Sequence, residues 1–200
     1  MKKILVTGSN GLLGQKLVYK LKDRADVELI ATARGENRLI NQKGYQFFSL
    51  DIGDKQNVDE VVNAVKPDFI IHTAAMTQVD DCELDHAACD KANVDAVQYI
   101  VDAAERNESH LIHISTDFIF NGKEGPYDEE GVADPLSYYG NAKWKGEQIV
   151  QKSKLKWAIL RTGLVDGIVE NMSRSNIVLW AKGALEKGDP INVVDDQFRS

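Results

Sequence analysis

The N-terminal stretch KKILVTGSNGLLG constrains the fold more than any other part of the chain. A short apolar run of strand type, residues 2–7, leads directly into Gly8, Gly11 and Gly14, spaced as G-x-x-G-x-x-G. An apolar-periodic helix begins inside these glycines, and a strand, a glycine turn and a helix in this order form a cradle for a pyrophosphate. Gly8 permits the tight turn, Gly11 lets backbone N–H groups approach phosphates, and Gly14 lets the helix pack close to the strand. Loops also use glycine for ordinary turns, but here the strand and the helix are both in place.

Strand and helix patterns alternate after this first unit, as a doubly wound parallel sheet of the α/β class requires. The further strands are expected at 27–33, 46–50, 69–72, 110–114 and 156–161. The further helices are expected at 57–65, from about 80, over 86–106 and from about 138. Beyond the last of these strands, the pattern predicts one more helix over 173–187 and a short strand over 191–194.

Composition and charge narrow the classes of partner. The apolar fraction of 43% and the charged fraction of 28% are those of a soluble globular protein. The net charge of −7 argues against nucleic acid as the main partner, and it means that local groups must hold any anionic ligand. No apolar run approaches the roughly 18 residues that a membrane helix needs, so no membrane partner is expected.

The start of the chain and its two cysteines bear on its location. Lys2 and Lys3 precede apolar residues, but this run is too short for a signal peptide and is broken at residues 8–10. Cys82 and Cys89 do not make a disulfide framework, so we expect a cytoplasmic protein. The two cysteines are seven residues apart, two turns along one helix face, and are interpreted as buried or half-buried thiols rather than as a redox pair.

The end of the second expected strand bears on cofactor choice. In a dinucleotide fold, an acidic residue at this point hydrogen-bonds the adenosine ribose 2′-OH, whereas an arginine accommodates a 2′-phosphate. This chain has Arg34, with Arg38 one turn further on, and Glu36 is the only nearby acid. The pattern predicts NADP(H) as the preferred cofactor and leaves NAD(H) open. The alternative is that Arg34 is an ordinary solvated arginine.

Tyr139 and Lys143 form the pattern Y-x-x-x-K, in which the phenol and the ammonium lie on one helix face. Tyrosine ionises near pH 10 in water, and a close lysine cation lowers its pKa, which would make Tyr139 a usable general acid or base. A hydroxyl at the end of the fifth strand, Thr116 or its neighbour Ser115, could hold a substrate oxygen as its charge changes. Surface helices carry many such pairs by chance, so the position after five strands and a glycine turn is what gives this one weight.

No metal site is predicted. His72 stands at the end of the fourth expected strand, but no further His, Cys or acidic residue follows at the spacing that a metal needs. We interpret it as a satisfied histidine at a strand end.

Several longer motifs resemble those of one superfamily. They are VTGSNGLLG, LDIGD, IIHTAAMTQVD, KANVDA, HISTDFIFNG, PYDEEGVADPLSYYGNAKWKGE and ILRTG, and ISTDFIFNG is the most specific. The chain resembles the extended short-chain dehydrogenase/reductase superfamily, and within it the dTDP-4-dehydrorhamnose reductase group, over essentially its whole length. The resemblance implies a Rossmann fold with strand order 3-2-1-4-5-6 over residues 1–162. Residues 163–200 would begin a small C-terminal substrate domain.

The same resemblance assigns roles to individual residues. Tyr139 would donate a proton to the 4-keto oxygen of a sugar, Thr116 would hydrogen-bond that oxygen, and Lys143 would bind the nicotinamide ribose and tune the tyrosine. The other expected cofactor contacts are Gly8, Asn10, Gly11, Leu12, Leu13 and Gly14 at the pyrophosphate, Arg34 at the 2′-phosphate, Asp51 and Ile52 by the adenine, and Ala74, Ala75 and Thr77 along the ribose and nicotinamide. Arg161 and Thr162 would begin the loop past the nicotinamide.

The chain departs from the family pattern at two positions and at its end. Phe118 stands where the family usually has tyrosine, and Arg34 stands where many members have aspartate. The first change is conservative, and the second supports NADP(H). The resemblance also implies that the chain stops just as a substrate domain begins. We therefore expect this chain alone to bind dinucleotide with little or no turnover.

Three functions compete at this point. The leading hypothesis is an NAD(P)H-dependent reductase of a nucleotide-activated 4-keto sugar, with the nucleotide sugar as partner and a homodimer as an option. An NAD-dependent sugar epimerase or dehydratase ranks lower, because Asp117 could be one half of the extra acid/base pair but no glutamate lies next to it. The third is a non-catalytic, NADP-binding subunit that resembles the regulatory subunit of methionine adenosyltransferase. Intact Thr116, Tyr139 and Lys143 favour chemistry.

Overall fold

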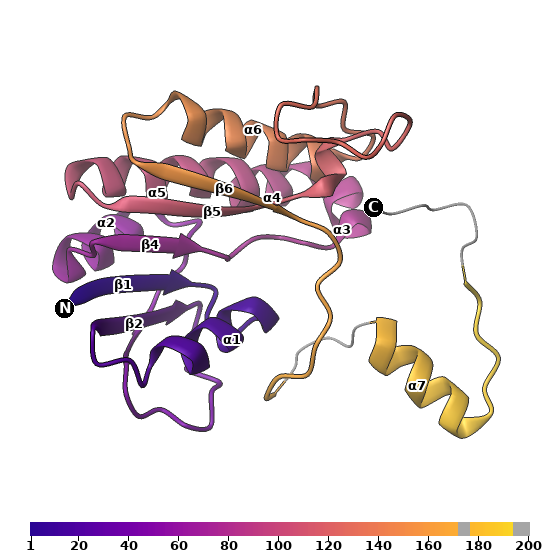
Figure 1. Ribbon diagram of the computed structural model, residues 1–200, viewed down its shortest axis with the longest axis horizontal. Helices are drawn as coiled ribbons and strands as arrows, with labels where there is room; N and C mark the ends of the chain where they lie inside the picture. Colours follow the sequence, from indigo (N-terminus) through magenta and orange to yellow (C-terminus); the bar gives the residue numbers. More distant parts are fainter. Residues whose placement is uncertain (172–176, 194–200) are drawn as a thin grey trace.

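Six parallel strands form one sheet in the order β3-β2-β1-β4-β5-β6, which confirms the predicted fold class (Figure 1). The computed structural model describes residues 1–171 and 177–193 of the chain. Every strand expected before residue 163 is present, with shifts of one or two residues at the ends of three strands. The strands are β1 (Lys2–Thr7), β2 (Val27–Ala33), β3 (Gln46–Ser49), β4 (Phe69–His72), β5 (His110–Thr116) and β6 (Trp157–Thr162).

Helices connect the strands and cover the sheet, and Figure 1 shows α5 and α6 running side by side along it. The helices are α1 (Leu12–Leu21), α2 (Lys55–Val65), α3 (Val79–Leu84), α4 (His86–Asp90), the π-helical segment η1 (Lys91–Asp95), α5 (Ala96–Arg106), the 3₁₀ turn η2 (Asp117–Ile119), α6 (Tyr138–Lys152) and α7 (Ile177–Lys187).

The core lies on both faces of the sheet because successive side chains of a strand point to opposite sides. Leu5 of β1 is in register with Ile30 of β2 and Ile70 of β4, and this buried row packs with the apolar faces of α2 and α5. The next residue, Val6, belongs to the opposite face, where Val18 of α1 is buried against it. Each such side chain contributes about 1.5–3 kcal/mol through burial, so alternation along β1 is enough to require helices on both faces.

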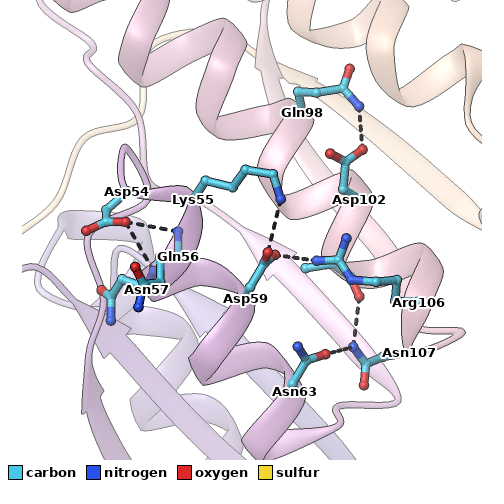
Figure 2. Close-up of polar contacts among 11 residues, drawn as sticks. Asp54, Lys55, Gln56, Asn57, Asp59, Asn63, Gln98, Asp102, Arg106 and Asn107 are labelled. Atoms are coloured by element: carbon cyan, nitrogen blue, oxygen red, sulfur yellow. Dashed lines mark hydrogen bonds and ion pairs between the residues drawn. The ribbon is translucent and has the colours of Figure 1, made fainter.

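A polar seam joins the outer surfaces of α2 and α5 (Figure 2). Asp59 of α2 pairs with Arg106 of α5 and, at 3.0 Å, with Lys55 one turn before it. Asn107 Nδ2, just after α5, donates to Asn63 Oδ1 at 2.8 Å. These groups are partly exposed to solvent, so each pair contributes about 1 kcal/mol or less and mainly sets how the two helices align.

The helical pattern predicted over 86–106 is present, but its centre is wound more loosely than an α-helix. Residues 91–95 form the π-helical segment η1 between α4 and α5. Asn93 in this segment is buried, and its side chain bonds both the N–H of Met76, at 3.0 Å, and the C=O of Met76, at 2.9 Å. A π turn inserts one residue into a helix, and here it coincides with an amide that holds the chain after β4.

Two predictions for the last part of the chain need correction or qualification. The helix expected over 173–187 is present as α7, while residues 173–176 lie outside the described residues. The strand expected over 191–194 is wrong for 191–193, which are not in a strand; residue 194 lies outside the described residues. An apolar alternation becomes a strand only when a sheet edge pairs with it, and β6 is paired only with β5 among the described residues.

A search of the described helices for membrane spans is negative. Over residues 1–171 and 177–193, no helix combines the length and the apolar character needed to cross a bilayer. The division into domains at residues 162 and 163 stays a prediction, although β6 ends at Thr162.

Candidate active site

The parallel arrangement brings the carboxyl ends of the central strands together. Thr7 at the end of β1 is in register with Thr32 of β2 and with His72 of β4. His72 is in register with His113 of β5. The order of the strands reverses between β1 and β4, and in open α/β sheets ligands bind outside the strand ends at such a point.

The glycine turn after β1 is closely packed where the sequence predicted a cradle. Gly8 has φ +70°, a conformation that L side chains rarely adopt, and a Cβ on it would lie 2.9 Å from the backbone of Ala74. A Cβ on Gly14 would lie 2.2 Å from the carbonyl oxygen of Gly8. Gly11 is the N-cap of α1 and provides no side-chain cap. The first N–H groups of α1, from Leu12 and Leu13 onward, are therefore available to an anion.

Thr7 ties the glycine turn to the segment after β4. Its hydroxyl oxygen accepts hydrogen bonds from the N–H groups of Thr73 and Ala74, both at 3.2 Å. The same hydroxyl lies 2.8 Å from Nδ1 of His72, so its proton can go to that nitrogen. Thr7 was not among the predicted site residues, yet it holds the start of the segment that includes Ala74 and Ala75, with Ala74 beside Gly8. Thr77, the next predicted cofactor contact, follows Met76, whose backbone N–H donates to the side chain of Asn93.

Asn10 fixes the loop that follows β2. Its Nδ2 donates to the C=O of Glu36 at 2.8 Å, and its Oδ1 accepts from the N–H of Arg38 at 2.9 Å. Arg34 and Arg38 are both exposed at this end of the sheet. The glycine turn and the predicted 2′-phosphate site are thus connected by one side chain, a link that the sequence did not show.

Asp51 and Ile52 follow β3 and lie at the same end of the sheet. The Oδ1 of Asp51 accepts from the N–H of Gly53 at 2.9 Å, and the N–H of Asp51 donates to Oδ1 of Asn57 at 2.8 Å. Ile52 is partly buried against the core. The side chains of Asp51 and Asn57 therefore fix this turn. The turn lies beyond β3, where Asp51 and Ile52 were predicted to contact an adenine.

Helix α6 brings Tyr139 to the end of β5. Ser137 caps the helix by accepting the N–H of Gly140 at 3.1 Å. A Cβ on Gly140 would lie 2.3 Å from the carbonyl oxygen of Phe118, so the first turn of α6 is in close contact with η2. Tyr139 is 8% exposed, and the side chain of Thr116, the last residue of β5, lies near enough to the phenol to lower the pKa of Tyr139 in part. The two residues predicted to act together on one oxygen do meet.

The pKa of Tyr139 moves in the direction opposite to the one expected from sequence. Burial raises the pKa of Tyr139 to about 12, and the side chain of Thr116 lowers it only in part. The prediction that Lys143 lowers this pKa is wrong for this structure. The reason is geometric, because Lys143 Nζ donates to the backbone oxygen of Ile114 at 2.7 Å, away from the phenol.

Lys143 is a buried cation, 3% exposed. Burial lowers the pKa of Lys143 to about 8, and the charge of Glu147, one turn further along α6, raises it in part. A lysine in this state is charged at neutral pH but close to losing its proton. Its charge therefore depends on the few groups around it.

Two buried histidines lie near Lys143. The rings of His72 and His113 stack with centroids 5.5 Å apart. Burial lowers the pKa of His72 to about 3 and that of His113 well below its ordinary value, and the charge of Lys143 lowers both further. His72 is only partly the satisfied histidine that we predicted, because its Nε2 has no partner among the described residues.

Glu147 and Arg161 also belong to this region, and the sequence analysis missed their connection. Glu147 is fully buried and is bound by the guanidinium of Arg161 on β6. A signal was present, because Tyr139, Lys143 and Glu147 are spaced four apart and lie on one face of a helix. Within residues 1–171 and 177–193, no group of three or more His, Cys, Asp or Glu side chains is placed to hold a metal ion.

Comparison with known proteins shows the family of the chain. A family model described as RmlD substrate binding domain matches residues 1–200. A dTDP-4-dehydrorhamnose reductase from Aggregatibacter actinomycetemcomitans is 35% identical over 199 residues, which are 99% of this chain and 62% of that protein. Methionine adenosyltransferase 2 subunit beta from Bos taurus is 30% identical over 178 residues, which are 89% of this chain and 51% of that protein.

A solved structure extends the comparison to three dimensions. The crystal structure of dTDP-4-dehydrorhamnose reductase from Bacillus anthracis, in complex with NADP, is 28% identical and has a TM-score of 0.75, covering 93% of this chain and 60% of that chain. The present chain thus spans between 51% and 62% of the curated relatives named above. Since the family model matches from the first residue to the last, the chain belongs to the RmlD substrate binding domain family, within the extended short-chain dehydrogenase/reductase superfamily.

Proposed function

We propose that the full-length protein is an NADPH-dependent reductase of a nucleotide-activated 4-keto sugar. The observation that carries the proposal is the meeting of Tyr139 with Thr116 at the end of β5, with buried Lys143 one turn behind the tyrosine. These groups lie at the same end of the sheet as the glycine turn. A proton donor, a hydroxyl and a cation grouped at this place are what carbonyl reduction requires.

The residues present suit a dinucleotide. The backbone at Gly8 and Gly14 is so close to its neighbours that a Cβ would fill the turn, and α1 begins without a side-chain cap. Gly8, Gly11 and Gly14, with the amides of Leu12 and Leu13, would hold the pyrophosphate. Asn10 would keep the turn and the Arg38 loop together. Asp51 and Ile52 would contact the adenine, and Ala74, Ala75 and Thr77 would lie along the ribose and nicotinamide.

Arg34 is the reason to favour NADPH over NADH. It is exposed at the end of β2, where a carboxylate would instead bind a free 2′-OH. A guanidinium can form a paired hydrogen bond with a phosphate and is always charged. The relative from Bacillus anthracis, whose structure was solved with NADP, supports the same choice.

The catalytic side chains would act as follows. A bound nicotinamide cofactor supplies the hydride. Tyr139 keeps its proton at neutral pH, because burial raises its pKa to about 12, and can therefore give it to the carbonyl oxygen of the sugar. Thr116 would donate a hydrogen bond to the same oxygen once its hydroxyl proton turns away from Asp117 Oδ1. Lys143, which lies one turn behind Tyr139 on α6, would bind the ribose of the nicotinamide.

The relatives also support a second candidate. The Bos taurus relative is a subunit of methionine adenosyltransferase, which favours a regulatory, NADP-binding role. The Thr116–Tyr139 contact favours chemistry, because a regulatory subunit does not need a buried tyrosine beside a hydroxyl. An epimerase or dehydratase is less well supported: Asp117 accepts a hydrogen bond from Thr116 at 3.1 Å, but Phe118 follows where a second acid would be needed.

The proposal is tested by supplying NADPH and a panel of nucleotide-linked 4-keto sugars to the full-length protein. We expect NADPH oxidation with at least one of them. The variant Tyr139→Phe should lose about 10²- to 10⁴-fold in kcat while its dissociation constant for NADPH stays unchanged. Turnover that survives Tyr139→Phe would exclude the tyrosine as the acid. No turnover with any sugar, together with a co-purifying partner protein, would favour the regulatory role.

A further inference from the structure

Glu147 is a fully buried carboxylate that the reaction proposed above does not use. It lies on α6 one turn after Lys143 and is 0% exposed. Arg161 of β6 binds it through three hydrogen bonds: Nε donates to Oε1 and to Oε2 at 3.2 Å, and Nη2 donates to Oε2 at 2.8 Å. A carboxylate in such a place is tolerated only when it is paired, so the arginine is its required partner.

The remaining arm of Arg161 reaches the loop over residues 120–135. Its Nη1 donates to the backbone oxygen of Glu129 at 2.9 Å, and its guanidinium carbon lies 5.4 Å from the ring centroid of Phe120. Phe120 stacks on Tyr127 with centroids 4.3 Å apart. One guanidinium thus joins α6, β6 and both sides of the loop that begins just after η2.

The location of this ion pair matters more than its contribution to folding. Replacing a buried ion pair by apolar side chains of similar volume often leaves a protein as stable or makes it more stable. Stability alone is therefore a weak reason for burying a glutamate here. Lys143 lies one turn before Glu147 on α6, and Arg161 contacts the 120–135 loop; both Lys143 and this loop adjoin the candidate active site.

We propose that Glu147 and Arg161 form a positioning pair for this site: Glu147 maintains the charge on Lys143, and Arg161 holds the 120–135 loop against the end of β6. The role of the site in catalysis rests on the proposed function, whereas the effect of Glu147 on the charge of Lys143 does not depend on it. Neither residue touches the reacting atoms. Each acts through a neighbour.

The surroundings of Lys143 explain why Glu147 controls its charge. His113 of β5 and His72 of β4 lie near it, and burial lowers the pKa of both, so they are uncharged at neutral pH. Cys89 of α4 acts on the pKa of Lys143 in the same direction as Glu147 but more weakly. Among the groups that raise the pKa of Lys143, Glu147 has the largest effect, and Arg161 binds the same carboxylate.

This arrangement predicts opposite effects for the two partners. In Glu147→Gln the ammonium of Lys143 loses its counter-charge, so its pKa should fall below about 8, by on the order of 1 pH unit. In Arg161→Gln the carboxylate loses the cation that offsets its charge, so its effect on Lys143 should strengthen and the pKa of Lys143 should rise. The double variant should lie between the two. A pair that merely supports the fold would not give shifts of opposite sign.

The measurement is an NMR pH titration of the full-length protein labelled with ¹³C at the lysine ε-carbons. The Lys143 resonance is assigned by its loss in Lys143→Arg. Asp59→Asn is the matched control, because it also removes a carboxylate from an arginine that joins two elements, but on the outer α2–α5 seam. We expect no shift of the Lys143 titration in this control.

The contact with the loop needs its own variant. Arg161→Lys keeps the charge but loses the paired hydrogen bonds, so the titration of Lys143 should change little. Amide exchange in residues 120–135 should instead rise about tenfold, because the Glu129 contact and the Phe120 stacking are weakened. Exchange in α2 serves as the internal reference.

Two outcomes would overturn the proposal. One is that Glu147→Gln and Arg161→Gln move the Lys143 titration in the same direction, or not at all, while both remain folded by near-UV circular dichroism. The other is unchanged exchange of the loop in Arg161→Lys. The titration does not use the reaction, so its failure is distinguishable from a failure to reduce any 4-keto sugar. If reduction is observed, the alkaline limb of kcat/KM should follow the same opposite shifts.

Discussion

At the scale of single residues, Lys143 shows how function opposes stability. Its ammonium is buried, and burial lowers its pKa to about 8. An unfolded chain binds the proton up to about pH 10.5, so between these two values the unfolded state holds more protons than the folded one. The free energy of unfolding therefore rises with pH across this window, and the charged form is a cost at neutral pH.

Removal of this charge should stabilise the fold. We expect Lys143→Met to raise the free energy of unfolding at pH 7 by about 1 kcal/mol or more, because a buried ammonium is replaced by an apolar side chain of similar length. The variant should also lose the increase in stability between pH 8 and 10.5. Denaturant unfolding at pH 7, 9 and 10.5 measures both effects. A variant that is less stable than wild type at pH 7 would contradict this account.

The choice of cofactor also belongs to the scale of residues. We expect Arg34→Ala to weaken NADPH binding by about 10- to 100-fold, which is the loss of a charged, paired hydrogen bond, and to leave NADH binding within a factor of about two. Fluorescence titration with both cofactors measures the change. Arg24→Ala is a suitable control, because Arg24 pairs with Asp26 on the surface before β2. If wild type prefers NADH, the interpretation of Arg34 is wrong.

At the scale of elements, the first turn of α1 and the end of β1 act as one unit. Gly14 is inside the helix, where glycine is normally unfavourable by about 1 kcal/mol relative to alanine. It is kept because the carbonyl oxygen of Gly8 occupies the space that a Cβ would need, at 2.2 Å. The close approach of this helix to its strand is therefore a property of backbone geometry rather than of side-chain packing.

Two glycine substitutions separate these effects. Gly14→Ala should destabilise the protein by about 1–3 kcal/mol and abolish dinucleotide binding, since the turn must open to admit the methyl group. Gly183→Ala in α7 meets nothing within 4 Å and should be neutral or stabilising by up to about 1 kcal/mol. Thermal unfolding and NADPH titration of both variants measure this. Dinucleotide binding that survives Gly14→Ala would mean that the turn is not the cradle.

At the scale of the whole molecule, helices bury much of the apolar surface of the described residues but leave part of it exposed to solvent. None of the residues of α7 is buried, and Figure 1 shows this helix apart from the sheet. Leu160 on β6 is 49% exposed, and Leu164 and Trp180 are also exposed. Exposed apolar side chains on β6, on the segment after it and on α7 are typical of surfaces that another segment or another chain covers.

The 200-residue chain, produced alone, should bind NADPH but turn over a 4-keto nucleotide sugar at least about 100-fold more slowly than the full-length protein. It spans 62% of the reductase from Aggregatibacter actinomycetemcomitans, and the groups that select the sugar are expected from residue 163 onward. It should also bind the dye ANS more strongly, because Leu160 and α7 are exposed. Turnover equal to that of the full-length protein would contradict the expected division at residues 162 and 163.

Much of the fold could be predicted because it depends on local patterns. The strand over 27–33 and the helix after Gly11 follow from apolar periodicity and from glycine positions, which need no knowledge of distant contacts. The strand expected over 191–194 was wrong for residues 191–193, for the opposite reason. Its alternation was adequate, but a strand forms only when a neighbour in the sheet pairs with it.

The sequence indicates which residues form the site, whereas their contacts and pKa values depend on the tertiary structure. The sequence by itself determined the alternation of strands and helices, the glycine turn, and the spacing that brings Tyr139 and Lys143 to one helix face, whereas the order of the strands was implied by the family resemblance. Only the tertiary structure decided that Tyr139 meets Thr116 and has its pKa raised, and that Lys143 shares its surroundings with Glu147 and Arg161. Periodicity is a property of neighbours along the chain, whereas desolvation and charge depend on groups that come together only when distant strands and helices pack.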